Sequence, residues 1–299
     1  MKFAPFLVNP GSKIKLKDYN PRFIADFEID GIRLGKDELK EKSREILQIG
    51  VAKLAEIQDK LYAQNTYGLL CIFQAMDAAG KDSTIKHVMS GVNPQGCQVF
   101  SFKQPSAEEL DHDYLWRYAK STPERGRIGI FNRSYYEEVL VVRVHPNLLE
   151  NQQLPLKLKK NPNIWEQRFE EINHFEKYLV NNGVIILKFF LNVSKEEQKK
   201  RFMERLNLPE KNWKFSVSDV KERQLWDEYM AAYEAVFNHT STEWAPWYIV
   251  PADRKWYMRL IVAGIIYQTL ENLGLNYPEI TSAQKQSLLE ARKLLESEA

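Results

Sequence analysis

The segment Phe73–Thr84 contains the residue types that a phosphate-binding loop requires. Ala78, Ala79 and Gly80 are small enough for their backbone N–H groups to converge on phosphate oxygens, and Lys81 supplies a positive charge for a transferred phosphoryl group. A short apolar run precedes the loop and a helical pattern follows it, so the helix N-terminus would add a partial positive charge. We interpret the segment as a phosphate-binding loop; the alternative is a chance Ala-Gly-Lys turn that begins a helix.

This loop departs from the common pattern G-x-x-x-x-G-K-[ST] at two positions. Ala75 replaces the first glycine, and Asp82 stands where a magnesium-binding hydroxyl is usual, with Ser83 directly after it. Asp77 lies inside the loop, where a carboxylate among phosphates is costly unless a cation lies between them. We therefore expect Asp77 to be a Mg²⁺ ligand.

A second group of polar residues follows another short apolar run, Arg127–Phe131. Asn132, Arg133 and Glu137 lie at or just beyond the end of this expected strand, and ligands bind at the carboxyl edge of open α/β sheets. Phosphate-loop kinases commonly have Asp at the position of Asn132, and Glu137 would restore the missing negative charge. The planar fork of Arg133 is suited to clamp phosphate oxygens. The alternative is a helix start with a surface Arg and a surface Glu.

A basic helical insert follows the fourth expected strand, near residues 199–223. Arg201 and Arg205 are four residues apart and share one helix face, and the next helix carries Lys221 and Arg223. Two such helices above a phosphate loop would form a lid that neutralises developing charge and excludes water. The alternative is a solvated, charged helical hairpin.

Five short apolar runs predict strands, and the segments between them have helical spacing. Strands are expected at 67–74, 98–102, 127–131, 184–191 and 247–250. Helices are expected at 36–64, 82–88, 107–119, 134–142, 164–180, 194–206, 217–238, 253–273 and 281–299. This alternation predicts an α/β fold, a five-stranded parallel sheet between helices. We divide the chain into an N-terminal arm (1–35), one domain that carries the lid (36–279) and a C-terminal helical tail (280–299).

Composition excludes several classes of protein. The 299 residues are 44% hydrophobic and 12% aromatic, so the chain has enough apolar material for a core and is not a disordered polymer. The net charge is +2, from 42 Lys+Arg and 40 Asp+Glu, which excludes a histone-like binder of nucleic acid. We expect the cations to gather in the lid and near the loop, and the acidic residues to lie on solvated helix faces elsewhere.

Location is also suggested by composition. The chain has no run of 18 apolar residues, and its first residues lack a secretory signal pattern. Cys71 and Cys97 have no metal-ligand spacing, so we expect buried thiols in a reducing compartment. The prediction is a cytoplasmic protein with no membrane partner and no nucleic-acid partner.

A set of short motifs resembles the polyphosphate kinase 2 family and covers most of residues 45–275. The motifs are Met76–Asp82, Asn93–Gly96, Ser101–Ser106, His112–Arg117, Phe131–Glu137, Lys188–Leu191 and Trp213–Ser216. The resemblance implies a thymidylate-kinase-like phosphate-loop fold with a helical lid. It also implies reversible transfer of the terminal phosphoryl group of inorganic polyphosphate to nucleotides, with Mg²⁺ as cofactor and Mn²⁺ as its substitute. The Asn-Arg-Ser-x-Tyr-Glu form resembles class III, whose members convert AMP to ADP and then to ATP.

The resemblance also implies roles for individual residues. The metal and phosphate residues of the loop would be Asp77 and Lys81, and both would be catalytic together with Arg133 and Glu137. Phosphate or polyphosphate binding is implied for Ala78, Ala79, Gly80, Lys81, Asp82, Ser83, Arg133, Arg201, Arg205, Lys214 and Arg223. Nucleotide binding is implied for Lys103, Asn132, Arg133 and Glu137. Related enzymes are homodimers or homotetramers, so we expect the same here.

Two other functions stay open at this point. An ATP-dependent nucleoside monophosphate kinase of the same fold would use one triphosphate donor, and the basic lid favours a longer donor. A non-catalytic protein that binds polyphosphate or RNA would need no metal-holding carboxylate in a phosphate loop, so Asp77 and Lys81 argue against it.

Overall fold

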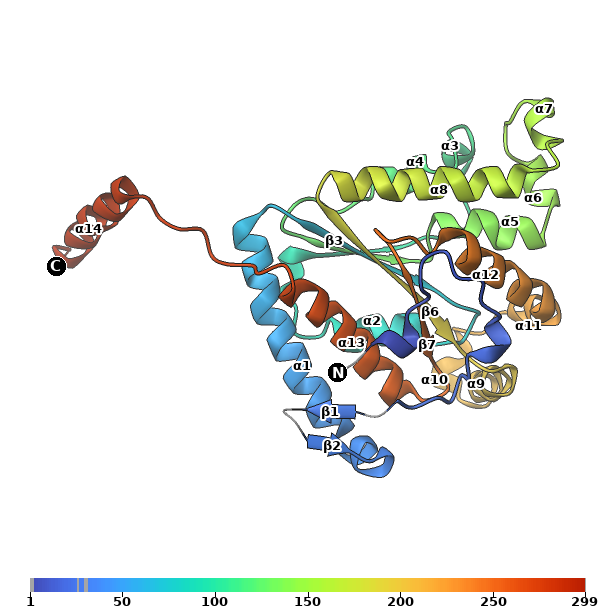
Figure 1. The fold of residues 1–299 in the computed structure, drawn as a ribbon, viewed down its shortest axis with the longest axis horizontal. Helices are drawn as coiled ribbons and strands as arrows, with labels where there is room; N and C mark the ends of the chain where they lie inside the picture. The colour runs from blue at the N-terminus through green and yellow to red at the C-terminus, as the bar shows by residue number, and fades with distance from the viewer. Residues whose placement is uncertain (1–2, 26, 30–31, 299) are drawn as a thin grey trace.

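The computed structural model describes residues 3–25, 27–29 and 32–298, and a five-stranded sheet lies at its centre (Figure 1). The strands run parallel in the order β4-β5-β3-β6-β7, which confirms the predicted sheet. Their bounds are β3 (Gly68–Gln74), β4 (Cys97–Ser101), β5 (Ile128–Asn132), β6 (Val184–Asn192) and β7 (Trp247–Pro251). Every residue of the central strand β3 is buried, because helices cover both faces of the sheet.

Helices pack on the two faces in pairs. On one face α1 (Lys36–Gln64) contacts α13 (Lys255–Glu271), and on the other α8 (Ile164–Asn181) contacts α12 (Trp226–Thr240) (Figure 1). The consecutive residues Leu260–Val262 of α13 are all buried, because this helix lies between α1 and the sheet. The α/β architecture predicted from the alternating pattern is therefore present.

Three helices occupy the position of the predicted lid, between β6 and α12. They are α9 (Lys195–Asn207), α10 (Pro209–Asn212) and α11 (Val217–Gln224). The Ser194 side chain caps α9 by accepting a hydrogen bond from the Glu197 backbone N–H at 3.1 Å. Because α9 follows β6 directly, the lid begins at the carboxyl edge of the sheet.

The other elements are short, apart from the C-terminal helix. They are the 3₁₀ helices η1 (Ala4–Phe6), η2 (Leu16–Asp18), η3 (Pro94–Gly96) and η4 (Tyr135–Val139), the strands β1 (Phe27–Ile29) and β2 (Ile32–Leu34), and the helices α2 (Lys81–Val88), α3 (Ala107–Leu110), α4 (Trp116–Ala119), α5 (Val141–Val144), α6 (Asn147–Glu150), α7 (Leu156–Lys159) and α14 (Ser282–Glu296).

Three of the expected helices differ in the structure. The segment 107–119 forms two one-turn helices, because the Asp113 carboxylate accepts the backbone N–H two residues on and makes a turn instead. The segment 134–142 begins as the 3₁₀ helix η4 and only then becomes α5. The segment 217–238 is two helices, α11 and α12, separated at Leu225. The continuous helices predicted for these segments were wrong.

The first residues pack against the edge strand β7. The Val8 backbone N–H donates to the Trp247 carbonyl at 2.8 Å, and Leu7 forms an antiparallel bridge with Tyr248. Phe6 and Val8 are buried. This segment therefore covers a sheet edge that would otherwise present unpaired backbone groups.

The C-terminal helix α14 stands apart from the body at the end of an extended segment (Figure 1). Its leucines 288, 289, 294 and 295 are each 55–68% exposed. A 15-residue helix that buries none of its residues is marginally stable in water on its own. Across the described ranges, no helix combines the length and apolarity needed to cross a membrane.

Candidate active site

The predicted phosphate-binding loop joins β3 to α2. Ala78 and Gly80 have positive φ angles of 58° and 112°. A Cβ at position 80 would lie 3.2 Å from Met258 Cε in addition to being strained, so glycine is required there. Positive φ angles therefore alternate with a negative one along residues 78–80, and such alternation turns successive backbone N–H groups toward one anion.

Lys81 is the first residue of α2 and reaches back across the loop. Its ammonium donates to the Ala75 carbonyl at 2.8 Å. Burial and, to a smaller extent, the positive charge of Arg133 lower the pKa of Lys81 from 10.5 to about 8, against the opposing effect of Asp77. A phosphate bound here would favour the charged amine, as the predicted role requires.

Arg133 lies between two carboxylates. Its guanidinium contacts Asp77 Oδ1 at 2.7 Å and Glu137 Oε2 at 3.0 Å. Glu137 raises the pKa of Arg133 most, burial opposes the shift, and Asp77 adds to it. Three of the four predicted catalytic side chains are thus in direct contact, although β3 and β5 supply them from separate parts of the chain.

Glu137 has a second partner that sequence reasoning missed. Gln74, the fully buried last residue of β3, donates its amide to Glu137 Oε1 at 2.8 Å. The amide fixes the carboxylate that in turn holds Arg133. A polar residue that ends an otherwise apolar buried strand was the available signal.

Asn132 contacts the end of the loop where α2 begins. Its amide donates to Asp82 Oδ1 at 2.6 Å, and Ser83 Oγ donates to the Gly80 carbonyl at 3.2 Å. The exposed Lys103 follows Phe102, whose backbone N–H donates to the Asn132 carbonyl at 3.1 Å. Lys103 therefore lies at the sheet edge where nucleotide binding is predicted.

Arg201 is hydrogen-bonded to the backbone of the loop. Its side chain is 5% exposed, and its NH1 group donates to the Ala78 carbonyl at 3.0 Å and the Ala79 carbonyl at 2.6 Å. Its NH2 group donates to the Ala252 carbonyl at 2.7 Å. These donors hold the backbone shape of the loop, while direct phosphate contact by Arg201 stays a prediction.

Arg223 connects to the same loop through a residue that sequence reasoning also missed. Its guanidinium donates to Gln198 Oε1 at 2.8 Å, and the Gln198 amide donates to the Asp77 carbonyl at 2.9 Å. Gln198 is buried in an otherwise charged helix, and only the packing of α9 onto the loop reveals its position.

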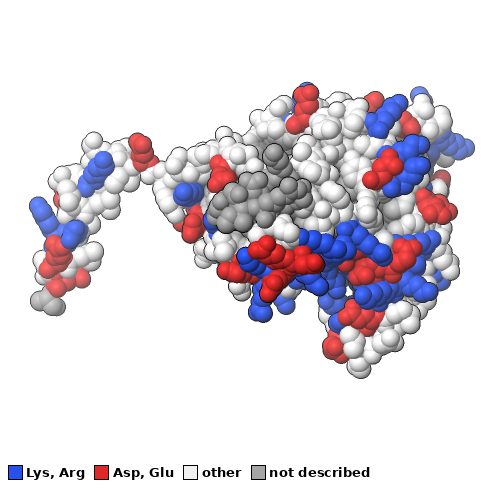
Figure 2. All heavy atoms as spheres, turned by 60° about the horizontal axis from the view of Figure 1, so that its bottom comes forward, with Lys and Arg blue, Asp and Glu red and all other residues white. Residues whose placement is uncertain are grey.

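Several cations of the lid are paired with acids. Arg205 contacts Asp219 at 3.3 Å and Lys211 contacts Glu204 at 2.6 Å, whereas the Lys214 ammonium lies 4.9 Å from the exposed Trp213 ring. Residues 195–223 contain nine Lys or Arg and six Asp or Glu. Figure 2 shows Lys and Arg gathered on the part of the body far from α14, with Asp and Glu interleaved. The expectation that acidic residues lie elsewhere was wrong for the lid.

A divalent metal would find its ligands at the loop. In the described parts of the chain there is no group of three or more His, Cys, Asp or Glu that could hold a metal ion. Mg²⁺ needs only one or two carboxylates when substrate phosphates and water complete its octahedron. The half-buried Asp77 fits that requirement, with its Oδ1 on Arg133.

Comparison with known proteins agrees with this arrangement. The family profile described as Polyphosphate kinase 2 (PPK2) matches residues 36–275. An ADP-polyphosphate phosphotransferase of Rhodopseudomonas palustris is 55% identical over 295 residues, which is 99% of each chain. An AMP/ADP-polyphosphate phosphotransferase of Meiothermus ruber is 42% identical over 285 residues, covering 95% of this chain and 99% of the relative. The crystal structure of Polyphosphate Kinase 2 from Arthrobacter aurescens TC1 superposes with a TM-score of 0.82 at 39% identity, covering 95% of both chains. The chain therefore belongs to the polyphosphate kinase 2 family of phosphotransferases.

Proposed function

We propose that the chain transfers the terminal phosphoryl group of inorganic polyphosphate to AMP and ADP, reversibly and with Mg²⁺. The names of the relatives from Rhodopseudomonas palustris and Meiothermus ruber support polyphosphate as donor and the two adenine nucleotides as acceptors. The observation that carries the proposal is the contact of Arg133 with both Asp77 and Glu137, in a chain of this family. That contact joins the donor loop to the residue that the class III resemblance connects with the acceptor.

The residues would act mainly by position and charge. Both substrates are polyanions, so the site must first offset their repulsion. Lys81 and the loop amides would hold the transferred phosphoryl group, and Arg133 would hold an oxygen of the acceptor beside it. Gln74 and Glu137 keep the guanidinium of Arg133 fixed, so that little reorganisation is needed during transfer.

No general base is needed, because an acceptor phosphate oxygen is already anionic at neutral pH. Asp77 would hold the metal, which would supply positive charge to offset the negative charge of the phosphates. Mn²⁺ offers the same octahedral oxygen chemistry and would substitute for Mg²⁺. The helices α9, α10 and α11 would exclude water from the site.

The alternatives are less well supported. An ATP-dependent nucleoside monophosphate kinase would share the loop, but the names of the relatives pair a nucleotide with polyphosphate and none of them names ATP. A binding protein without turnover would not need Arg133 to connect Asp77 with Glu137.

Assembly and location are part of the proposal. The exposed leucines of α14 support a homodimer or homotetramer, in which a second copy of the chain covers them. Cys71 and Cys97 are free thiols, which supports a reducing, cytoplasmic location.

The test is to incubate the protein with AMP, polyphosphate and Mg²⁺ and to separate the nucleotides by chromatography. We expect ADP to form first and ATP to follow. A parallel reaction supplies ATP and AMP without polyphosphate. Formation of ADP in that reaction alone would replace the proposal with the ATP-dependent kinase, and no product in either would leave only the binding protein.

A further inference from the structure

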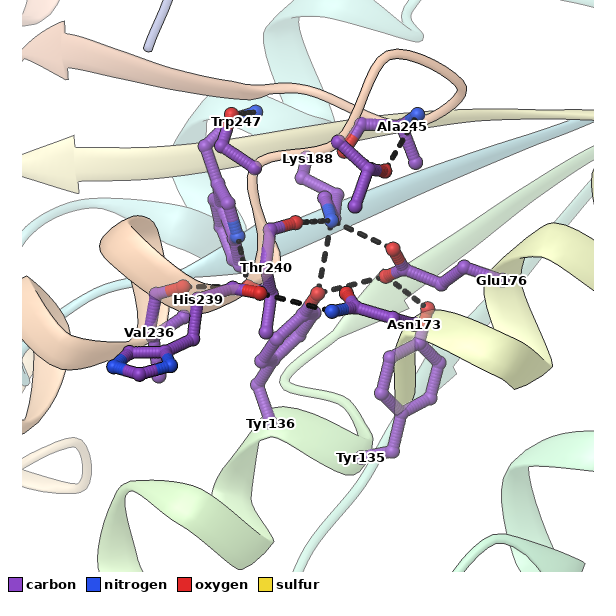
Figure 3. A network of polar contacts seen from close by, with 12 residues as sticks. Tyr135, Tyr136, Asn173, Glu176, Lys188, Val236, His239, Thr240, Ala245 and Trp247 are labelled. Carbon is purple, nitrogen blue, oxygen red and sulfur yellow. Dashed lines mark hydrogen bonds and ion pairs between the residues drawn. The ribbon is translucent and has the colours of Figure 1, made fainter. Parts of the chain in front are cut away.

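A cluster of polar side chains lies in the core beyond the catalytic residues (Figure 3). Lys188 of β6 donates to Glu176 Oε2 at 2.6 Å, to the Tyr136 hydroxyl at 2.9 Å and to the Thr240 carbonyl at 2.7 Å. Glu176 Oε1 accepts the hydroxyls of Tyr135 at 2.9 Å and of Tyr136 at 2.8 Å. All three N–H bonds of the ammonium and both carboxylate oxygens are therefore used.

This ion pair is not explained by stability. Lys188 and Glu176 are both 0% exposed, and removing two ions from water is energetically costly. Burial lowers the pKa of Lys188, and Glu176 opposes that shift. Apolar residues of similar volume often give equal or greater stability at such sites. A contribution other than net stability would account for the pair.

The two tyrosines connect the cluster to the active site. Tyr135 and Tyr136 belong to the stretch 133–137, in which Arg133 and Glu137 are the first and last residues. The two hydroxyls point into the core. Arg133 instead reaches Asp77 in the loop, and Glu137 accepts a hydrogen bond from the side-chain amide of Gln74 at the end of β3. Arg133 has a φ of 67°, a conformation that is strained for an L-residue. The stretch must therefore be held in place from outside.

We propose that the buried Lys188–Glu176 pair is a positioning device for Arg133 and Glu137. The inference rests on the proposed function, in which these two side chains meet the phosphates of the substrates. By fixing two adjacent hydroxyls, the pair sets where η4 begins and how its opposite side faces the loop. A shift of about 1 Å in such a group costs up to 10²-fold in rate.

The same helix holds η4 at a second point. Arg168 of α8 lies 3.5 Å from Glu138 Oε1, and the Gln152 amide donates to both oxygens of Glu138 at 2.8 and 3.0 Å. Arg168 and Glu176 are two turns apart on α8, so the helix contacts η4 at its start and near its end. This second attachment agrees with a brace that limits movement of the whole stretch.

The test compares variants that remove the connection but keep the volume. The double variant Glu176→Leu with Lys188→Met removes both charges together, because removing one would leave the other buried and unpaired. We expect its Tm to equal or exceed that of the unaltered protein, while kcat for ADP and polyphosphate falls about tenfold to hundredfold. KM changes less than about twofold, because the lost interaction acts at the transition state. The double variant Glu176→Gln with Lys188→Met also removes both charges but keeps an acceptor for the hydroxyls, so its kcat should lie between those of the unaltered protein and the first double variant.

The decisive measurement repeats the double variant in an Arg133→Ala background. If the pair acts through Arg133, its removal there lowers the residual kcat less than about twofold. An equal loss in both backgrounds, or an unchanged kcat in the folded double variant, would overturn the positioning role. Absence of transfer in the unaltered protein would instead refute the proposed function, so the two failures are distinct.

A milder pair of variants covers the case in which the double variant does not fold. Tyr135→Phe and Tyr136→Phe remove only hydroxyls, and Tyr257→Phe is the matched control. The Tyr257 hydroxyl is also buried, but it accepts the Ala25 backbone N–H at 2.8 Å, outside the cluster. We expect kcat to fall in the first two variants and not in the control. Equal effects in all three would contradict the proposal.

Discussion

Replacing Lys81 by Met tests the central charge of the site. Methionine keeps much of the volume of the side chain and removes the ammonium that donates to the Ala75 carbonyl. Removing one preorganised donor from a group that stabilises transition-state charge costs about 10²–10³-fold in rate. We expect kcat/KM for polyphosphate to fall by that factor in Lys81→Met.

The structure also predicts that kcat/KM falls as the pH rises past the pKa of Lys81. Burial and Arg133 lower the pKa of Lys81 to about 8, and only the protonated amine attracts phosphate. In the unaltered protein kcat/KM should therefore be level below pH 8 and fall above it. One unit above this pKa about one molecule in eleven carries the proton, so kcat/KM at pH 9 should be about tenfold lower than on the plateau. Bound phosphate favours the charged amine, so the corresponding fall in kcat should lie at higher pH.

The assay follows ATP formation from ADP and polyphosphate between pH 6.5 and 9.5 at constant ionic strength. The Lys81→Met variant should lose the fall near pH 8 together with the rate. Lys86→Met is the matched control, because Lys86 is an exposed lysine on the same helix. Retention of more than one tenth of kcat/KM in Lys81→Met, or a level profile to pH 9.5 in the unaltered protein, would refute this account.

Four further predictions follow from the same contacts. Glu137→Ala should lower the rate with AMP more than the rate with ADP, because AMP has a single phosphate to be oriented by Arg133. Both rates are measured by chromatographic separation of the nucleotides, and an equal loss of rate with the two acceptors would contradict this prediction. Asp77→Asn should reduce transfer at least 10²-fold and raise the Mg²⁺ concentration needed for half-maximal rate, and an unchanged Mg²⁺ dependence would remove its metal role. Arg201→Met should lower the free energy of unfolding in urea by about 2–4 kcal/mol, since it leaves buried loop carbonyls unpaired; an unchanged midpoint would disprove the bracing role. A chain ending at Ile280 should form a smaller assembly by light scattering, and an unchanged mass would exclude α14 from the interface.

The parts of the site that sequence could predict are those whose chemistry is local. Asp77 and Lys81 stand four residues apart in one loop, so their proximity follows from the chain itself. Arg133 and Glu137 were predictable for a different reason, because parallel strands bring their carboxyl ends to one edge. Together, the local loop sequence and the shared carboxyl edge of the strands bring Arg133 within 2.7 Å of Asp77.

Other parts depended on packing that no local pattern encodes. Gln74 and Gln198 are single amides in an apolar strand and in a charged helix, and their roles arise only from the partner that the fold places opposite them. Likewise, residues 134–142 have helical spacing, but the buried hydroxyls of Tyr135 and Tyr136 hold the first turn as a 3₁₀ helix. Tertiary contacts overrode the local preference in the stretch that positions Arg133 and Glu137.

The ion pairs of the lid separate two kinds of arginine that the sequence does not distinguish. Arg205 is 22% exposed and its partner Asp219 is 19% exposed, so the pair is partly open to solvent, and solvent-accessible pairs contribute only about 0–1 kcal/mol. A polyphosphate chain can replace such a carboxylate at little cost, because it offers more negative charge to the same guanidinium. Arg201 is 5% exposed and donates to buried loop carbonyls, which a ligand cannot replace without leaving them unpaired. If the lid binds polyphosphate as proposed, its solvent-accessible pairs would supply the binding charge while Arg201 shapes the loop, so a net charge of +2 is compatible with a highly charged polyanion as substrate.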